Sequence, residues 1–198
     1  MTLVIALMSL VLLSSLATSL VVVTNTEQRA AANYAASRET MYAADGALQI
    51  ATRELLTGGD WTALLATGTL SVFVDGAPAG VRQLGDGSTL DLLAATDLAN
   101  SEARPWGPNN PVWRLFAFGW LGPRTYVLAW IGDDSSETDG DPLTDGGGAG
   151  NPGSGVLAVR AEAFGVGGAH KVLETTVRRP VDADGISVMQ VVSWQEIR

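Results

Sequence analysis

The first charged side chain in this sequence is Glu27, and this long uncharged start limits what the chain can fold into. Residues 1–23 are almost entirely Leu, Val, Ile, Ala and Met, with a few Ser and Thr. As a helix, such a run is long enough to cross a hydrocarbon core of about 30 Å. No Gly or Pro precedes Gly46, and strong helix formers continue beyond Glu27. The sequence therefore predicts one helix of about 80 Å over residues 1–56, apolar in residues 1–26 and amphipathic in residues 27–56.

The amphipathic half carries a stripe of larger and apolar side chains, made of Tyr34, Met41, Tyr42, Leu48, Ala51 and Leu55. Four of these positions are seven residues apart, which is typical of a helix face that packs against a domain core or a neighbouring helix. Gly46 is costly inside a helix, so we expect close packing there. The run Thr-Gly-Gly at 57–59 predicts the end of the helix.

Residues 57–198 are enough for one domain with its own core. A short helix is predicted at 61–66, with Asp60 as its N-cap. Strands are predicted at 70–74, 81–84, 89–93, 112–118, 125–131, 156–164, 170–177 and 186–194, with a looser segment at 94–111. Short loops between successive strands favour an antiparallel sheet. The predicted fold class is α+β, a long N-terminal helix packed on a C-terminal antiparallel β-sheet domain.

Composition excludes several classes of function. The formal net charge is −9, and an acidic surface argues against nucleic-acid binding. The chain has no Cys and a single His, His170, which leaves little for thiolate, disulfide or histidine chemistry. Ser154 lies between glycines without the spacing of a nucleophile elbow. The run Gly-Val-Gly-Gly at 165–168 predicts a turn, since no Lys-Ser/Thr follows it. We therefore expect no catalytic site and no bound organic cofactor.

The acidic loop at 133–141 is the best candidate for a ligand site. Glu137, Asp139 and Asp141 place carboxylates at alternate positions, and flexible sets of oxygen ligands suit Ca²⁺. The spacing is not that of an EF-hand, and a solvated acidic loop is the alternative interpretation. Trp106 and Trp120 lie in predicted loops, where they can make surface contacts.

Several short runs resemble those of a known family. Scattered Arg29 and Arg38 precede Ala-Ala-Asp-Gly-Ala-Leu at 43–48, and the C-terminal part holds Gly-Ser-Gly-Val-Leu-Ala-Val-Arg-Ala-Glu-Ala at 153–163 and Val-Ser-Trp-Gln-Glu at 192–196. Together with the apolar start, these runs resemble the type IV pilin superfamily, and most closely the PilX-type minor pilins and pilus-assembly proteins.

The resemblance implies a structural subunit that polymerises through its apolar helix into an extracellular type IV pilus filament. It implies that a leader peptidase has removed a short basic leader, and that the subunit sits in the inner membrane before the assembly machinery extracts it. Its partners would be copies of itself and other pilins. The residues expected to mediate assembly are Met1, Leu3, Val4, Ile5, Leu7, Leu10, Leu13, Leu16 and Leu20.

Ile5 departs from the family pattern, because major pilins usually carry a Glu at the fifth mature position to neutralise a neighbour's N-terminal amine. A buried amine without a carboxylate partner is costly. Two interpretations therefore stay open, a repeating filament subunit and a specialised minor pilin or pseudopilin at a tip or in priming. A membrane-anchored periplasmic enzyme or binding protein is a third, but it would need a convergent polar site.

Overall fold

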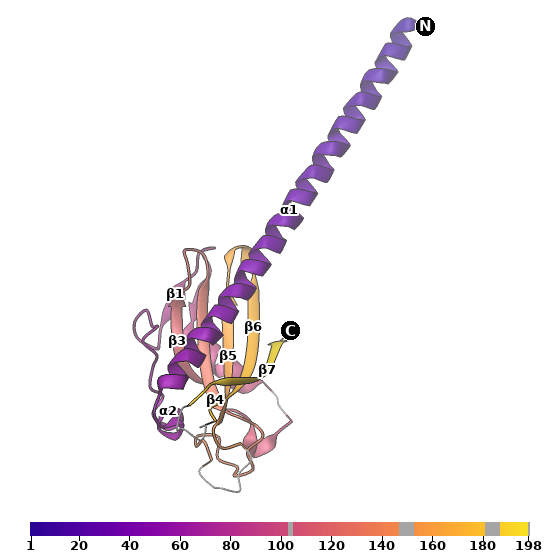
Figure 1. Cartoon of the computed structure of the whole chain (residues 1–198). Coiled ribbons are helices and arrows are strands. Elements are labelled where there is room, and N and C mark those ends of the chain that lie inside the picture. The colour runs from indigo at the N-terminus through magenta and orange to yellow at the C-terminus, as the bar shows by residue number, and fades with distance from the viewer. Residues whose placement is uncertain (103–104, 147–152, 181–186, 198) are drawn as a thin grey trace. The chain divides into compact units, whose positions relative to one another are not determined.

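The computed structural model describes residues 1–102, 105–146, 153–180 and 187–197. In chain order (Figure 1), its elements are α1 Thr2–Thr57, α2 Trp61–Thr67, β1 Val81–Gln83, β2 Thr89–Asp91, α3 Leu92–Ser101, a 3₁₀ turn Gly107–Asn109, β3 Arg114–Trp120, β4 Tyr126–Asp133, β5 Val156–Phe164, a 3₁₀ turn Val166–Gly168, β6 His170–Arg178 and β7 Gln190–Ile197. The predicted α+β fold is confirmed, with a long N-terminal helix and an antiparallel sheet after it.

Helix α1 contributes to two compact units, Met1–Ala36 and Ser37–Arg198, with the boundary inside the helix. In the second unit, one face of α1 is buried, through Thr40, Ala43, Ala44, Ala47, Leu48, Ala51 and Leu55. These residues recur every three or four positions, which is the spacing of one helix face. Most are small, so the helix backbone approaches the sheet closely. A Cβ on Gly46 would lie 2.8 Å from Cδ2 of Leu121, which confirms the close packing expected there.

The predicted stripe is correct for Leu48, Ala51 and Leu55 and wrong for two tyrosines. Tyr34 and Tyr42 are 68% and 63% exposed. Tyr42 follows the buried Thr40 by two positions, and this spacing turns it away from the buried face. Its ring instead contacts the guanidinium of Arg38, 5.0 Å from the ring centre.

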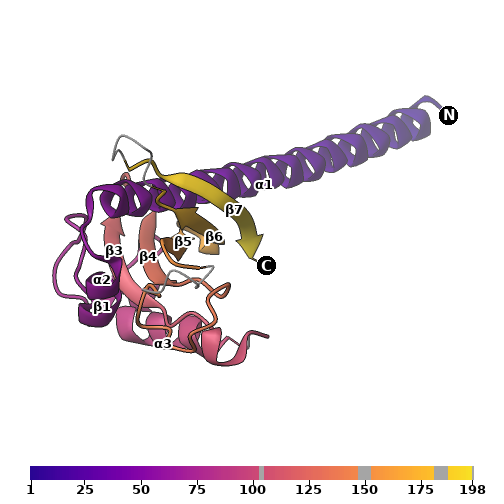
Figure 2. The same ribbon diagram turned by 60° about the horizontal axis from the view of Figure 1, so that its bottom comes forward.

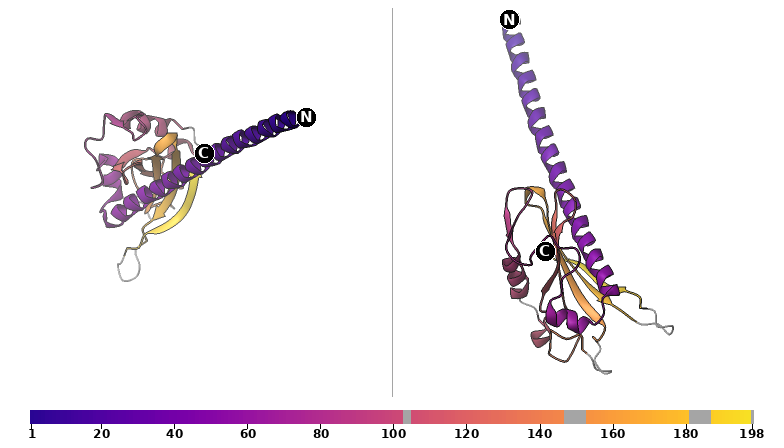
Figure 3. Two further views of the ribbon diagram at one scale, coloured as in Figure 1. Left: turned by 90° about the horizontal axis from the view of Figure 1, so that it is seen from above. Right: turned by 90° about the vertical axis from the view of Figure 1, so that its left-hand side faces the viewer.

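The large sheet has the strand order β3-β4-β5-β6-β7, and every neighbouring pair is antiparallel. Side chains of β4 alternate between two cores, and all are buried. Val127, Ala129 and Ile131 pack with α2 and with residues 37–57 of α1. Tyr126, Leu128 and Trp130 pack on the opposite face, where α3 lies (Figures 2 and 3). The second unit therefore has three layers, and β4 contributes side chains to the cores on both faces of the sheet.

Tryptophans anchor both cores. Trp61 of α2 is buried, its Nε1 donates to the carbonyl of Leu55 at 3.1 Å, and the guanidinium of Arg179 lies 4.3 Å from its ring centre. On the other face, Trp130 is buried, and its Nε1 donates to Oγ1 of Thr96 in α3 at 2.9 Å. The indoles of Trp61 and Trp130 thus have partners for their N–H groups at the points where helices meet the sheet.

The strand predicted at 70–74 is wrong, since this segment forms only an isolated parallel bridge between Val74 and Phe118. Glu54 of α1 is the physical reason. Its carboxylate accepts hydrogen bonds from the Ser71 hydroxyl at 2.7 Å and from the Val72 backbone N–H at 3.2 Å. The Ser71 backbone N–H still donates to the carbonyl of Phe116 in β3 at 2.8 Å, so the Glu54 carboxylate replaces a strand partner at Val72.

The loose segment predicted at 94–111 is also wrong, because α3 occupies much of it. The Asp91 carboxylate accepts hydrogen bonds from the backbone N–H groups of Leu93 and Ala94, at 2.9 and 3.2 Å, so it caps α3. The strand predicted at 89–93 therefore ends at Asp91. Asp60 caps α2 in the same way, as predicted.

The remaining boundaries differ by small shifts. Strand β3 begins and ends two residues later than the predicted 112–118. Strand β7 covers Gln190–Ile197, so the strand predicted at 186–194 extends further toward the C-terminus, and its first residue, 186, lies outside the described residues.

Candidate functional site

The apolar half of α1 exposes large hydrophobic side chains. Met1 is fully exposed, and exposed fractions lie between 56% and 76% for the other residues expected to mediate assembly: Leu3, Val4, Ile5, Leu7, Leu10, Leu13, Leu16 and Leu20. Among the described residues, α1 is the one helix long and apolar enough to cross a membrane, with a window of mean hydropathy 2.3 that is not buried.

The exposed apolar residues surround the helix instead of following one face. Leu7, Leu10 and Leu13 are successive steps of three residues, and with 3.6 residues per turn such steps drift around the axis. Each leucine left in water forgoes about 1.5–3 kcal/mol of burial free energy. A stable environment for this segment must therefore cover its whole circumference, as lipid does or as several neighbouring helices do.

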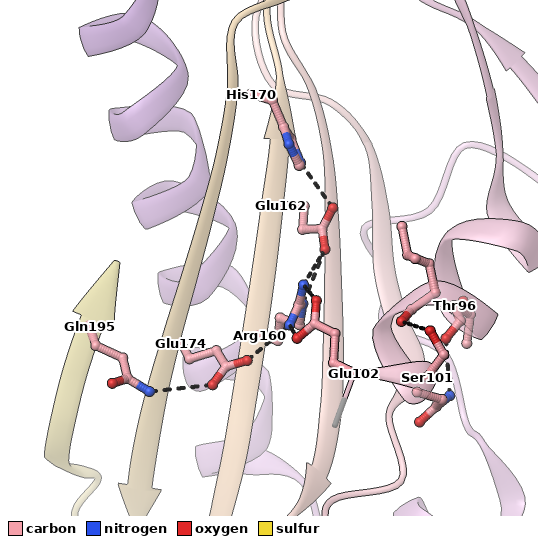
Figure 4. Close-up of polar contacts among 10 residues, drawn as sticks. Thr96, Ser101, Glu102, Arg160, Glu162, His170, Glu174 and Gln195 are labelled. Carbon is pink, nitrogen blue, oxygen red and sulfur yellow. Dashed lines mark hydrogen bonds and ion pairs between the residues drawn. The ribbon is translucent and has the colours of Figure 1, made fainter. Parts of the chain in front are cut away.

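A buried ionic cluster joins α3 to the sheet (Figure 4). Arg160 of β5 is only 3% exposed, and its Nη2 lies 2.7 Å from Oε1 of Glu102 and 2.8 Å from Oε1 of Glu162. Its Nη1 lies 3.1 Å from Oε1 of Glu174 on β6. Burial alone would lower the pKa of Arg160, but the hydrogen bonds to Glu102 and the charge of Glu162 raise it. The guanidinium is therefore held charged between three carboxylates.

His170 extends this cluster at the start of β6. Its Nε2 lies 3.0 Å from Oε2 of Glu162, and its ring stacks on Phe164 with ring centres 4.6 Å apart. Burial alone would raise the pKa of Glu162, but the hydrogen bond with His170 and the charge of Arg160 lower it below its ordinary value. The carboxylate of Glu162 thus bridges Arg160 and His170. We assign the cluster to holding α3 on the sheet.

The sheet register keeps Ser154 away from His170. Val156, just after Ser154, begins β5 opposite Arg178, whereas His170 lies opposite Phe164 at the other end of the strand. The run 165–168 forms a turn, as predicted. Trp106 and Trp120 are 53% and 40% exposed. The loop predicted for Trp120 is wrong, because this residue is the last of β3 and pairs with Tyr126 of β4.

The structure brings together two of the three predicted calcium ligands. Carboxylate oxygens of Glu137 and Asp139 lie within 4.8 Å of each other and of an oxygen of Asp133. Asp141 is outside this group. Its backbone N–H donates to Oδ1 of Asp139 at 2.9 Å, and its own Oδ1 accepts from the N–H of Leu143 at 3.2 Å. We call Asp133, Glu137 and Asp139 the acidic cluster.

The sequence did not predict Asp133 as a ligand. The predicted ligands lie at alternate positions of an extended loop, and Asp133 is outside that series. Asp133 is the last residue of β4, where it pairs with Leu157. The loop turns back on this strand end, as shown by the Glu137 N–H donating to the Asp134 carbonyl at 3.4 Å. The feature of the sequence that could have indicated Asp133 as a ligand is an Asp at the end of an apolar strand.

Burial shapes the electrostatics of the acidic cluster. Asp133 and Glu137 are 3% and 1% exposed, and Asp139 is exposed. Desolvation and the negative charge of Glu137 raise the pKa of Asp133 to about 8. Desolvation also raises the pKa of nearby Asp145. Gly153 packs so tightly here that a Cβ would collide with Cγ of Glu137.

Comparisons with protein-family models, with curated proteins and with solved structures found no match for this chain. What the protein does must therefore be argued from the exposed apolar helix, the fold of the second unit and the chemistry of its clusters.

Proposed function

We propose that this chain is a structural, pilin-like subunit that polymerises through the apolar half of α1 into an extracellular type IV pilus filament. The observation that carries the proposal is the exposed apolar segment of α1, with Leu3–Leu20 side chains presented on all sides of the helix. The same helix continues into residues that form part of the core of an antiparallel β unit. Helix α1 thus contains both an exposed apolar segment and residues that are part of the core of a folded domain.

During assembly, the apolar segment of α1 would exchange its contacts with lipid for contacts with other subunits. In the inner membrane, lipid surrounds the apolar segment, and in a filament the same surface packs against the helices of neighbouring subunits. Burial away from water is worth about 25 cal/mol per Å² of apolar surface, so a subunit extracted from lipid must find such neighbours. Other pilins, a leader peptidase and the inner-membrane assembly machinery are the partners that this cycle requires.

Ile5 favours a second candidate, a specialised minor pilin at a filament tip or in priming. Ile5 is 62% exposed and uncharged, so it offers no carboxylate to a neighbour's amine. A subunit at a tip has fewer neighbours, and the unpartnered amine is then less costly. The number of copies per filament separates the two candidates.

Imaging of sheared extracellular material by cryo-electron microscopy tests the proposal directly. If this chain fits the repeating density, it is a filament body subunit. Filaments that contain a few copies outside the repeat identify it as a minor pilin. A chain found only in the membrane fraction, never with filaments, would overturn both candidates and leave a membrane anchor.

A matched pair of variants links that result to the apolar segment. A Lys near the centre of a membrane helix costs about 2.5–3.5 kcal/mol, so Leu13→Lys is expected to deplete the chain from membranes and filaments. Ala32→Lys, on an exposed position outside the uncharged run, is the control and should assemble as the parent does. Equal incorporation of the two variants would contradict a role for the apolar segment in assembly.

A further inference from the structure

Asp133 presents a buried oxygen that the rest of the described chain leaves without a hydrogen-bond donor. The residue is 3% exposed, and its Oδ1 is inaccessible to solvent and has no hydrogen-bond partner among the described residues. A buried carboxylate oxygen in this condition carries a desolvation penalty that a ligand can offset. An oxygen of the same carboxylate lies within 4.8 Å of oxygens from Glu137 and Asp139.

Arg179, whose charge acts on the Asp145 carboxylate, has partners of its own elsewhere. Arg179 donates to the carbonyls of Gly58 and Gly59 at the end of α1, and it stacks on the ring of Trp61. Asp133 forms no ion pair among the described residues. The next residue, Asp134, is a second buried acidic side chain. Acidic groups therefore gather at the end of β4, where a bound cation would stabilise their charged forms.

We propose that the acidic cluster of Asp133, Glu137 and Asp139 binds one Ca²⁺ ion. Calcium takes oxygen ligands at 2.3–2.6 Å, so two ligands on opposite sides of one ion stand up to about 5 Å apart. Oxygens within 4.8 Å of one another fit that span. Magnesium demands a near-ideal octahedral set of ligands and gives up its water reluctantly. A set of three protein carboxylates, two of them buried, therefore favours Ca²⁺.

The surrounding chain holds these ligands in place. Asp133 is fixed in the β4–β5 ladder, and Oε2 of Glu137 accepts from the N–H of Gly146 at 2.9 Å. Asp139 is oriented by the Asp141 N–H at 2.9 Å and by the Thr144 hydroxyl at 3.4 Å. Because Asp139 is exposed, it provides a route for the ion and room for water ligands. Two buried carboxylates and one exposed carboxylate thus form a site that is supported from within and open on one side.

Titration of the full chain in detergent tests this proposal without any filament, so its failure is distinguishable from failure of the proposed function. The protein is treated with EGTA, dialysed, and titrated calorimetrically with CaCl₂ and separately with MgCl₂. We expect one Ca²⁺ per chain, weaker Mg²⁺ binding, and a rise in Tm of about 3 °C or more at ten times the Kd. No heat and no Tm shift at millimolar Ca²⁺ would overturn the site, and equal affinity for Mg²⁺ would overturn its assignment to calcium.

Variants of one loop separate a built site from general attraction to acidic residues. Asp133→Asn and Asp139→Asn are each expected to weaken Ca²⁺ binding at least tenfold. Asp141→Asn removes the same charge from the same loop outside the cluster, and it should bind Ca²⁺ as the parent does. Without Ca²⁺, Asp133→Asn should melt no lower than the parent, since it relieves repulsion by Glu137. If Asp133→Asn does not fold, the exposed Asp139→Asn decides, and equal losses in Asp139→Asn and Asp141→Asn would overturn the cluster.

Discussion

At the scale of single residues, the fold contrasts two ways of burying acidic side chains. Glu162 and Glu174 share the guanidinium of Arg160, so each of these buried carboxylates has a cationic partner inside the protein. Asp133 has no such partner among the described residues, and its pKa is raised to about 8 by burial and by Glu137. The carboxylates around Arg160 have their cation within the protein, whereas a bound cation would offset the burial of Asp133.

Replacing Arg160 tests the first arrangement. Arg160→Met keeps much of the side-chain volume but leaves Glu162 and Glu174 buried without their shared cation. Breaking a buried ion pair from one side costs about 3–5 kcal/mol, so we expect a loss of that size in the free energy of unfolding. Denaturant unfolding measured by tryptophan fluorescence gives the value. Arg124→Met, at an exposed position, is the control and should stay within about 0.5 kcal/mol of the parent. Equal losses in both variants would contradict a structural role for the ionic cluster.

At the scale of elements, short polar signals set where helices begin, and packing sets which of their faces are buried. Asp60 and Asp91 each cap a helix through backbone N–H groups. Helix α3 then places Leu92 and Ala99 in the second core and brings Glu102 to Arg160. The cap of α3 therefore supports both the hydrophobic core and the ionic cluster on this face of the sheet.

The cap makes a prediction for α3. Asp91→Ala removes the acceptor for the N–H groups of Leu93 and Ala94, and losing such a cap typically costs about 1 kcal/mol. Asp97→Ala, at an exposed interior position of the same helix, removes the same charge without touching the cap, so it should be neutral or slightly stabilising. Thermal unfolding of both variants checks the difference. A loss in Asp97→Ala as large as that in Asp91→Ala would indicate a general charge effect.

At the scale of the whole molecule, the chain divides within its longest helix. Residues 1–35 are exposed throughout, and the buried residues of α1 begin at Thr40. The apolar segment therefore contributes nothing to the core of the unit Ser37–Arg198, whose stability must come from its own three layers.

Two truncations test this division. A chain that begins at residue 37 keeps every buried residue of α1, so we expect it to fold without detergent and to melt within a few degrees of the full chain. A chain that begins at residue 48 loses Thr40, Ala43, Ala44 and Ala47, and this exposes apolar surface of the sheet. We expect it to melt far lower or not to fold. Circular dichroism melts provide the measurement, and a shorter chain as stable as the longer one would contradict the division.

The sequence alone determined the properties that depend on neighbouring residues. The uncharged run before Glu27, the absence of early Gly and Pro, and the Thr-Gly-Gly stop predicted α1 correctly, because helix formation and termination are local. Alternating apolar stretches with turn residues between them predicted β4, β5 and β6, since a strand buried on a sheet shows this pattern. The Asp60 cap was predicted for the same reason.

Only the tertiary structure decided what depends on distant partners. The Glu54 carboxylate takes up the Val72 N–H in place of a strand partner, and the turned face of α1 leaves Tyr34 and Tyr42 exposed. The Arg160 cluster gathers charges from α3, β5 and β6, and the acidic cluster takes Asp133 from the end of β4 in place of Asp141. Such contacts join residues far apart in the sequence, so no local pattern encodes them. They form only when register and packing bring the side chains together.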